Sequence, residues 1–279
     1  MKEYISGKKH IKNISYFILI FFTILFLYPI FWLFLNSFKT ATELFDSPWS
    51  LPASFSLENY IRAIIVGNVG RYFLNSTIVT SIVVLLSTTL SAMAAYGIQR
   101  LKWKLSTVVL SIFLLGMTIP SHATIIPLFS MFNFLRINNT YIAVIIPHIV
   151  FTLPISIFIL TGFFKTIPLE MEEAAVVDGY SIPKAFIKII IPISTSSLVT
   201  VAVITFITAW NDLLFPQIFL SEPSMMTLPV GLTAFQGRYS TDYVGMIAAV
   251  VITIIPSIIT YCLLNKRIIN GMVTGAVKG

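Results

Sequence analysis

Residues 14–35 read ISYFILIFFTILFLYPIFWLFL, a continuous run without one charged side chain. A helix needs about 20 apolar residues to cross a hydrocarbon core of about 30 Å. Four lysines precede the run (Lys2, Lys8, Lys9 and Lys12), as they do in a signal peptide. The run is too long for a signal peptide, and it ends in Asn36–Lys39 without a small-residue cleavage pattern. The stretch therefore predicts a retained membrane-spanning helix.

Five further apolar runs of similar length follow along the chain. They are Phe73–Ile98, Ser106–Leu128, Tyr141–Phe163, Ser196–Leu214 and Tyr243–Leu264. The whole sequence of 279 residues agrees with them, because 57% of it is hydrophobic, only 10% is charged and its mean hydropathy is +0.91. Soluble proteins carry about 25% charged residues. We therefore expect an all-α membrane protein with six transmembrane helices.

The basic residues predict the orientation of these helices, because cytoplasmic loops are enriched in lysine and arginine. Most basic residues flank the spans at the N-terminus, the second loop, the fourth loop and the C-terminal tail, and only five lie in the other three loops: Lys39, Arg62, Arg71, Arg136 and Arg238. Both termini are therefore predicted to be cytoplasmic. The net charge of +7 is explained by topology and by contact with membrane lipid, so nucleic-acid binding is not expected.

Several kinds of active site find no support in the sequence. Three scattered histidines and one cysteine, Cys262, offer no metal-ligand cluster and no disulfide. No nucleophile–base pattern or glycine-rich phosphate loop is present. We expect no catalytic residue, no metal and no cofactor bound by this chain, so any energy for work has to come from a partner.

Few polar groups fall inside the predicted spans. His148 is interpreted as a packed helix residue near Pro147, with His122 beside Pro120 interpreted in the same way. Asn211 and Asp212 have two interpretations that stay open, a polar translocation path or the cap of a helix end. Prolines 120, 127, 147 and 154 are expected to break or kink spans three and four.

The fourth loop, residues 165–192, reads KTIPLEMEEAAVVDGYSIPKAFIKIIIP and predicts two helices joined by a turn. Thr166 is the expected N-cap of the first helix, whose early turns contain Glu170, Glu172 and Glu173. Gly179 is the expected C-terminal stop. A second helix is expected from Ser181 to about residue 190, before Pro192. Helices that lie on a membrane surface favour lysine and arginine, so these acids favour contact with a soluble partner.

This loop resembles the EAA motif of the permease subunits of ATP-binding cassette (ABC) importers. Glu173, Ala174 and Ala175 are followed by three residues and Gly179, then by nine residues, Ile189, Ile191 and Pro192; Ile191 replaces the usual leucine. Further stretches are similar to the second permease subunit of carbohydrate importers of the maltose-transporter type: Asn75–Thr77, Ala94–Arg100, Trp210–Asp212 and Gly271–Gly279.

The resemblance implies the fold of type I ABC importer permeases and a place for each site residue. The ATPase-coupling residues would be Glu173, Ala174, Ala175, Asp178, Gly179, Ile189 and Pro192. A tail of Gly275, Ala276, Val277, Lys278 and Gly279 would contact the ATPase, and Asn211 and Asp212 would line the translocation path. The implied partners are a second, different permease, two ATPase subunits that bind ATP and magnesium, and an extracytoplasmic sugar-binding protein.

The implied function is the import of a di- or oligosaccharide across a bacterial cytoplasmic membrane, coupled to closure of the ATPase dimer. The expected division is residues 1–71 (N-terminus, first span and outer loop), 72–264 (five-helix core with the coupling loop) and 265–279 (cytoplasmic tail). The outer loop Asp212–Asp242 is expected to dock the binding protein through Glu222 and Tyr239. The alternative is a stand-alone carrier or channel, although the spans contain few groups for ion coupling.

Overall fold

The computed structural model describes residues 2–101, 103–235, 237 and 241–276, and within them it contains helices and no β-strand. Four helices are long and apolar enough to cross a membrane: α1 (Lys2–Asn36), α4 (Val69–Arg100), α7 (Tyr141–Phe164) and α14 (Tyr243–Ala276). Two bent helix pairs bring the number of candidate spans to six. The expected all-α membrane architecture is confirmed.

The bent pairs lie where the sequence predicts spans three and five. In the first pair, α5 (Ser106–Gly116) is followed after Pro120 by η1 (Ser121–Thr124) and α6 (Ile125–Phe134), at an angle of 86°. In the second pair, residues 182–193 meet α11 (Thr195–Trp210) at 79°. Pro120 thus breaks span three as expected, because proline cannot donate the helical hydrogen bond.

The structure shows no break at Pro147 and Pro154 of the fourth span, and the fifth span ends earlier than expected. Helix α7 is continuous, with Pro147 and Pro154 inside it. Neighbouring helices and side-chain hydroxyls can satisfy the backbone groups that proline frees in a membrane helix. Span five ends at Trp210 and not at Leu214, because a new short helix, α12 (Leu214–Phe219), begins there.

The chain divides into two compact units, and the first comprises Met1–Val69 and Leu232–Ile252. It contains α1, α2 (Ala41–Asp46), α3 (Glu58–Ile65), η4 (Thr233–Phe235) and the start of α14. Leu44 of α2 is buried with Val244 and Ile247 of α14, and Trp32 and Leu33 of α1 pack on them. This cluster attaches the short helix α2 to the ends of two spanning helices.

Polar contacts also order the segment around α2 in the first unit. Thr40 and Glu43 form a reciprocal capping box at the start of α2, and Glu43 Oε1 also accepts a hydrogen bond from Ala53 N at 3.0 Å. These backbone hydrogen bonds, the one from Thr40 first, hold the pKa of Glu43 below its ordinary value. Lys39 is almost fully buried, and its Nζ donates to the Ser47 carbonyl at 2.9 Å.

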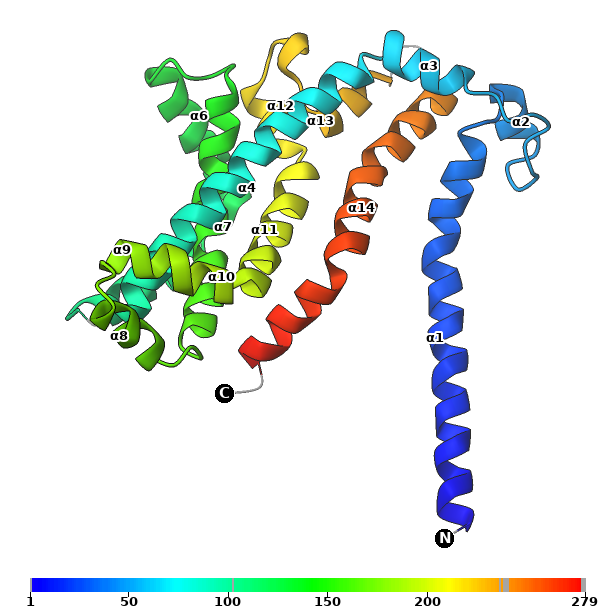
Figure 1. The fold of residues 1–279 in the computed structure, drawn as a ribbon. Helices are drawn as coiled ribbons and strands as arrows, with labels where there is room; N and C mark the ends of the chain where they lie inside the picture. Colours follow the sequence, from blue (N-terminus) through cyan, green and yellow to red (C-terminus); the bar gives the residue numbers. More distant parts are fainter. Residues whose placement is uncertain (1, 102, 236, 238–240, 277–279) are drawn as a thin grey trace. The chain divides into compact units, whose positions relative to one another are not determined.

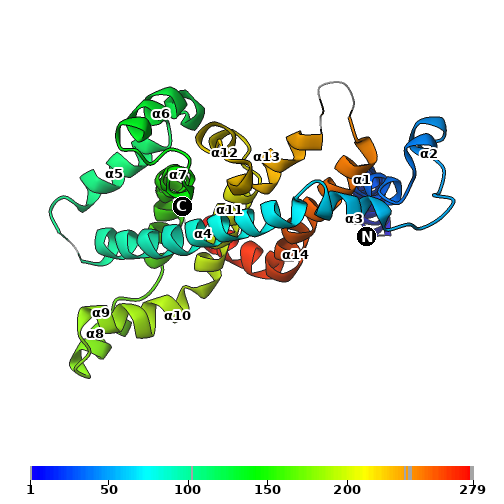
Figure 2. The same cartoon turned by 90° about the horizontal axis from the view of Figure 1, so that it is seen from above.

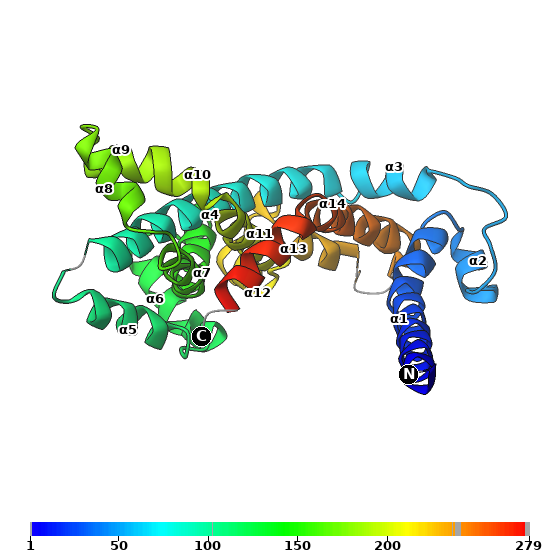
Figure 3. The same cartoon turned by 60° about the horizontal axis from the view of Figure 1, so that its bottom comes forward.

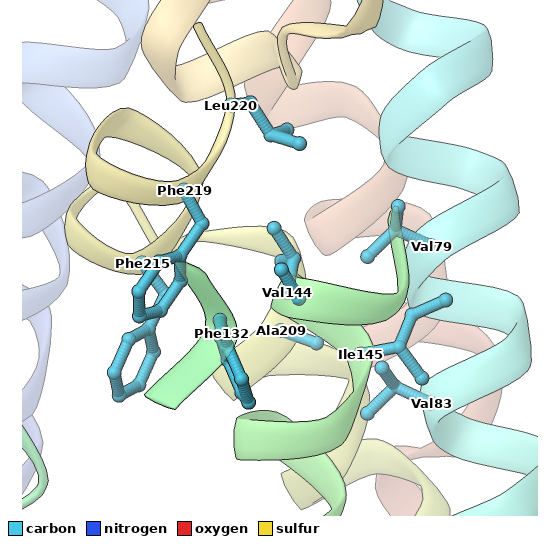
Figure 4. Packing of buried hydrophobic residues seen from close by; sticks show 10 residues of the cluster. Val79, Val83, Phe132, Val144, Ile145, Ala209, Phe215, Phe219 and Leu220 are labelled. Carbon is cyan, nitrogen blue, oxygen red and sulfur yellow. The ribbon is translucent and has the colours of Figure 1, made fainter. Parts of the chain in front are cut away.

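The second unit comprises Gly70–Gly231 and Thr253–Gly279 and contains two apolar clusters. Figure 4 shows the first, which joins α4, α6, α7, α11 and α12 through Val79, Val83, Phe132, Val144, Ile145, Ala209, Phe215, Phe219 and Leu220. The second joins α4, α7 and α11 to the fourth loop through Ala92, Ala95, Tyr96, Leu160, Phe163, Phe164, Ile167, Ile190 and Val201. Helices in a membrane associate through such close packing, since lipid is as apolar as the side chains.

Small residues let α4 and α7 approach each other between these clusters. Ser87, Ser91 and Ala92 are buried on α4, and Ser87 Oγ lies 2.9 Å from Thr152 Oγ1 of α7. The interhelical hydrogen bond satisfies both hydroxyls inside the bundle.

The two ends of the second unit carry different short helices. Figure 1 shows α6 and α12 at one end of this unit and α8 (Glu170–Val177) and α9 (Ile182–Ala185) at the other. Figures 2 and 3 both show α8 and α9 projecting beyond the long helices of the unit. The remaining short elements are η2 (Phe186–Ile190), α10 (Ile191–Ile193), η3 (Pro223–Met225) and α13 (Leu228–Leu232).

Candidate functional site

The fourth loop forms two helices joined by a turn, as the sequence predicts. Helix α8 has Glu170, Glu172 and Glu173 in its first turn, where negative charge stabilises the helix dipole. The predicted N-cap is wrong, because α8 begins after Leu169. Thr166 instead donates its hydroxyl to the Phe163 carbonyl at 2.8 Å, which places it at the end of α7.

Gly179 ends α8 with a left-handed backbone conformation. Its φ is +82°, and Gly179 N donates to Val176 O at 3.0 Å while Tyr180 N donates to Ala175 O at 2.9 Å. This pair of bonds is the Schellman motif, in which glycine is favoured because a Cβ destabilises positive φ. The turn that separates the two loop helices therefore depends on Gly179, as expected.

The second loop helix continues further than expected. It consists of α9, a π-helical segment η2 and α10, so that Pro192 lies inside α10 and does not end the helix. Pro192 directly follows the π-helical segment, in which Ile191 N donates to the Phe186 carbonyl five residues back. Lys184 Nζ lies 4.0 Å from the ring centroid of Tyr180, which links α9 to the turn.

The predicted coupling residues divide into exposed and buried ones. Glu173, Ala174, Asp178, Gly179 and Pro192 are exposed, whereas Ala175 is buried and Ile189 is half-buried. Beside the exposed ones lie three apolar side chains of α8, Met171, Val176 and Val177, with 43%, 54% and 86% of their surface exposed. We call this combination of exposed apolar and acidic side chains on α8 and its turn the α8 surface.

Glu172 behaves differently from the other acids of the loop, and sequence analysis missed its role. Its side chain is buried against the end of α4, where Arg100 forms an ion pair with it and Tyr96 donates a hydrogen bond of 2.8 Å. The exposed acids of the loop are therefore Glu170, Glu173 and Asp178. The only sequence signal was that an arginine ends the second apolar run.

The C-terminal tail is helical as far as the structure describes it. Gly275 and Ala276 belong to α14, which extends beyond the predicted end of the sixth span. The other predicted tail residues, Val277, Lys278 and Gly279, lie outside the described residues.

Asp212 caps a helix, which was one of the two interpretations that the sequence left open. Its carboxylate accepts hydrogen bonds from Leu214 N at 3.3 Å and Phe215 N at 3.2 Å, at the start of α12. Asn211 is exposed and donates to the Ile207 carbonyl at 2.9 Å.

Asp212 also faces His148, the buried histidine of α7. His148 Nε2 lies 3.4 Å from Asp212 Oδ2, and His148 Nδ1 lies 2.7 Å from the Val144 carbonyl. Because a carbonyl only accepts, Nδ1 donates that hydrogen bond. The expected packed and hydrogen-bonded state of His148 is confirmed.

The segment after α12 belongs to the predicted docking loop. Side chains of α4 form hydrogen bonds with its backbone. Asn75 Nδ2 donates to the carbonyls of Ser224 and Met226 at 3.0 and 2.9 Å, and Ser76 Oγ accepts from Leu228 N at 2.7 Å. Asn75 Oδ1 accepts from the hydroxyl of Tyr141 at 2.8 Å. The loop up to residue 228 is therefore held against α4. Of the predicted docking residues, Glu222 belongs to this segment and Tyr239 lies outside the described residues.

No group of three or more potential metal-ligating side chains occurs among the residues that the structure describes. The candidate site residues lie in two regions at opposite ends of the second unit, namely the α8 surface and the segment that Asn75 holds against α4.

Comparison with known proteins gives the family. A family model described as "Binding-protein-dependent transport system inner membrane component" matches residues 87–268. A putative ABC transporter permease protein of Caldicellulosiruptor sp. is 36% identical over 272 residues, which cover 97% of this chain and 98% of that protein. The diacetylchitobiose uptake system permease protein NgcG of Streptomyces coelicolor is 31% identical over 275 residues, covering 98% and 91%.

A solved structure supports the fold. A chain in the crystal structure of a bacterial ABC transporter involved in the import of the acidic polysaccharide alginate superposes with a TM-score of 0.81. The superposition covers 93% of this chain and 97% of that chain, at 20% sequence identity. The chain therefore belongs to the inner-membrane components of binding-protein-dependent transport systems, as a multi-pass permease subunit of an ABC importer.

Proposed function

We propose that this permease subunit carries a di- or oligosaccharide into the cell and receives its energy through the α8 surface from an ATPase subunit. The α8 surface is the observation that carries the proposal. Val177 and Val176 expose apolar side chains outside the spanning helices, beside Glu173 and Asp178. Exposed apolar side chains rimmed by polar groups are typical of a protein interface.

The motif residues have distinct parts in this interface. Glu173, Ala174, Asp178 and Gly179 face the ATPase, and Ala175 packs the helix against its own subunit. Ile189 and Pro192 belong to the second loop helix, which supports the first. Closure of the ATPase dimer on ATP and magnesium then moves the loop as a rigid body, so that the spans change from inward-facing to outward-facing.

This chain works in an assembly with other proteins, to which it contributes contact surfaces. The assembly comprises a second, different permease, two ATPase subunits and an extracytoplasmic binding protein. In this assembly the present chain transports and does not catalyse. The tail from Gly275 to Gly279 contacts the ATPase, so truncation after Gly271 lowers both uptake and stimulated ATP hydrolysis.

The outer loop Asp212–Asp242 docks the binding protein, and Asn211 and Asp212 contribute to the path. Support comes from the attachment of its first part to α4 through Asn75 and Ser76, which gives a partner a fixed surface. Crosslinks from a reactive group at Glu222 to the binding protein are expected. Complete absence of such crosslinks contradicts this part of the proposal.

The sugar is proposed from the relatives, because one is named for diacetylchitobiose uptake. Uptake of labelled diacetylchitobiose, maltose and trehalose by proteoliposomes that contain the whole importer tests this part. ATP-dependent uptake of one of them supports a di- or oligosaccharide. Uptake of an amino acid or of a metal ion in place of all three contradicts it.

Crosslinking tests the α8 surface itself. With Cys262 replaced by alanine, Val177→Cys should form a crosslink to the ATPase in membranes, and the crosslinking yield should depend on ATP. Phe134→Cys is the matched control, because Phe134 is equally exposed but lies at the other end of the second unit. Equal crosslinking yields at the two positions would contradict the assignment of the interface.

A further inference from the structure

The contact between α4 and α8 is built around one buried arginine. Arg100 is the last residue of α4, and its side chain is only 7% exposed in the structure. Its Nε and Nη2 both contact Glu172 Oε1, and Tyr96 donates to Glu172 Oε2 at 2.8 Å. We call Tyr96, Arg100 and Glu172 the α4–α8 joint.

The remaining donors of the guanidinium reach the segment between α7 and α8. Arg100 Nη1 donates to the Phe164 and Ile167 carbonyls at 3.2 and 2.9 Å, and Nη2 donates to the Pro168 carbonyl at 3.3 Å. A guanidinium has five N–H donors in a fixed plane, and here its three nitrogens form four hydrogen bonds and an ion pair. One side chain therefore connects the ends of α4 and α7 with the first turn of α8.

Lysine cannot replace this geometry. Its ammonium is a compact point charge with three donors, whereas the contacts of Arg100 are spread over a carboxylate and three carbonyls. Phe164 is the last residue of α7 and Ile167 and Pro168 follow it, so Arg100 lies at the C-terminal end of this helix, where a cation is favourable. Breaking a buried ion pair by removing one partner is costly, because the other charge stays buried.

Aromatic packing extends the joint to the second loop helix. The ring centroid of Tyr96 lies 4.7 Å from that of Phe186, and Tyr96 belongs to the buried cluster that includes Ile167 and Ile190. An eight-residue helix such as α8 is marginal without tertiary contacts. The joint supplies such contacts on the side of α8 opposite to the α8 surface.

We infer that the α4–α8 joint makes the coupling loop and the cytoplasmic ends of α4 and α7 one rigid body, so that Arg100 and Glu172 are positioning residues for energy coupling. This inference rests on the proposed function, in which α8 binds the ATPase. In the assembled importer, a movement that the ATPase imposes on α8 then reaches α4 through Glu172 and Arg100. Without the joint, α8 follows the ATPase and α4 does not.

Hydrogen exchange of the purified importer, measured by mass spectrometry without nucleotide and with ATP, magnesium and vanadate, tests the joint. In the wild type, the exchange rates of α8 and of the last two turns of α4 should change together on nucleotide binding. A change in α8 without a change in α4 would overturn the inference. A change in neither would contradict the proposed contact of α8 with the ATPase, and so the two failures are distinguishable.

Glu172→Gln isolates the role of the ion pair. The ATPase subunits should still co-purify and α8 should still respond to nucleotide, whereas the response of α4 and the sugar uptake per ATP hydrolysed should fall about tenfold or more. The KM for ATP should stay unchanged. A variant that assembles with the wild-type response of α4 would overturn the inference.

Glu58→Gln is the matched control, because Glu58 is an exposed acid in the first turn of α3 and has the same relation to a helix dipole. It should leave the nucleotide response unchanged. If Glu172→Gln does not assemble, Tyr96→Phe keeps the ring against Phe186 and removes only the hydroxyl. This variant should weaken the response of α4 about two- to tenfold, the range expected for one hydrogen bond, and an unchanged response would overturn the inference.

Discussion

Gly179→Val should loosen the turn between the two loop helices without creating a clash. Apart from the adjoining residues, no heavy atom lies within 4 Å of the position that a Cβ would take, so an added Cβ acts through the backbone conformation. A residue with a Cβ destabilises the left-handed conformation by about 1–2 kcal/mol. Gly179 has a φ of +82°, and at 1.4 kcal/mol per factor of ten the penalty lowers the ratio of native to non-native turn about 5- to 30-fold. The affinity for the ATPase should fall by up to the same factor, because the ATPase binds the native arrangement and the apparent affinity follows the fraction of permease that has it.

The assay compares ATPase binding by the solubilised permease with ATP-driven uptake in proteoliposomes. Gly179→Asn should keep most of the affinity, because asparagine tolerates positive φ better than valine. Gly162→Val controls for the added side chain, since Gly162 also has open space around it but lies within α7. A Gly179→Val permease with wild-type affinity and uptake would refute the reasoning about the turn.

Three further predictions concern α2, the start of α4 and α13. Hydrogen bonds lower the pKa of Glu43, so the capping box stabilises α2 fully above a pH of about 4.5, and this stabilisation is lost as the pH falls through the lowered pKa. Hydrogen exchange of α2, measured against pH, should show the loss. Glu43→Gln should abolish the pH dependence of this exchange. Asn75→Ala leaves the Met226 carbonyl without its side-chain donor, while the Ser224 carbonyl keeps the 2.8 Å hydrogen bond from Arg71 Nε. The variant should lower stability by about 1–3 kcal/mol, whereas the exposed Thr77→Ala should not, and equal melting temperatures would contradict this. Gly231→Ala places a Cβ 2.0 Å from a buried tyrosine ring and should lower the free energy of unfolding by about 1–3 kcal/mol, as thermal unfolding would show. Gly97→Ala is the control, because its Cβ meets open space.

Local chemistry made much of the fold and the loop predictable. A charge-free run such as residues 14–35 specifies a spanning helix by its length alone. Gly179 specifies the end of α8 because glycine is favoured where φ is positive. These features depend on neighbours in the sequence, so reading the chain finds them.

Long-range partners were not predictable in this way. Arg100 counted as a topological charge and as the last residue of a family-like stretch, and Glu172 as one acid of a helix start, although the two meet across 72 positions in the sequence. The cap formed by Asp212 depends on α12, a six-residue helix without a periodic signal of its own. From its sequence position, Thr166 could cap the end of α7 or the start of α8. The packing of α7 decides between these two ends.

Purification of the importer by a tag on this chain, in mild detergent, followed by mass spectrometry of the bound proteins, tests the central claim most directly. The account predicts ATPase subunits together with one different permease, and loss of the ATPase alone from the Gly179→Val variant. Recovery of this chain by itself, or as a homo-oligomer that still transports in liposomes, would contradict the account.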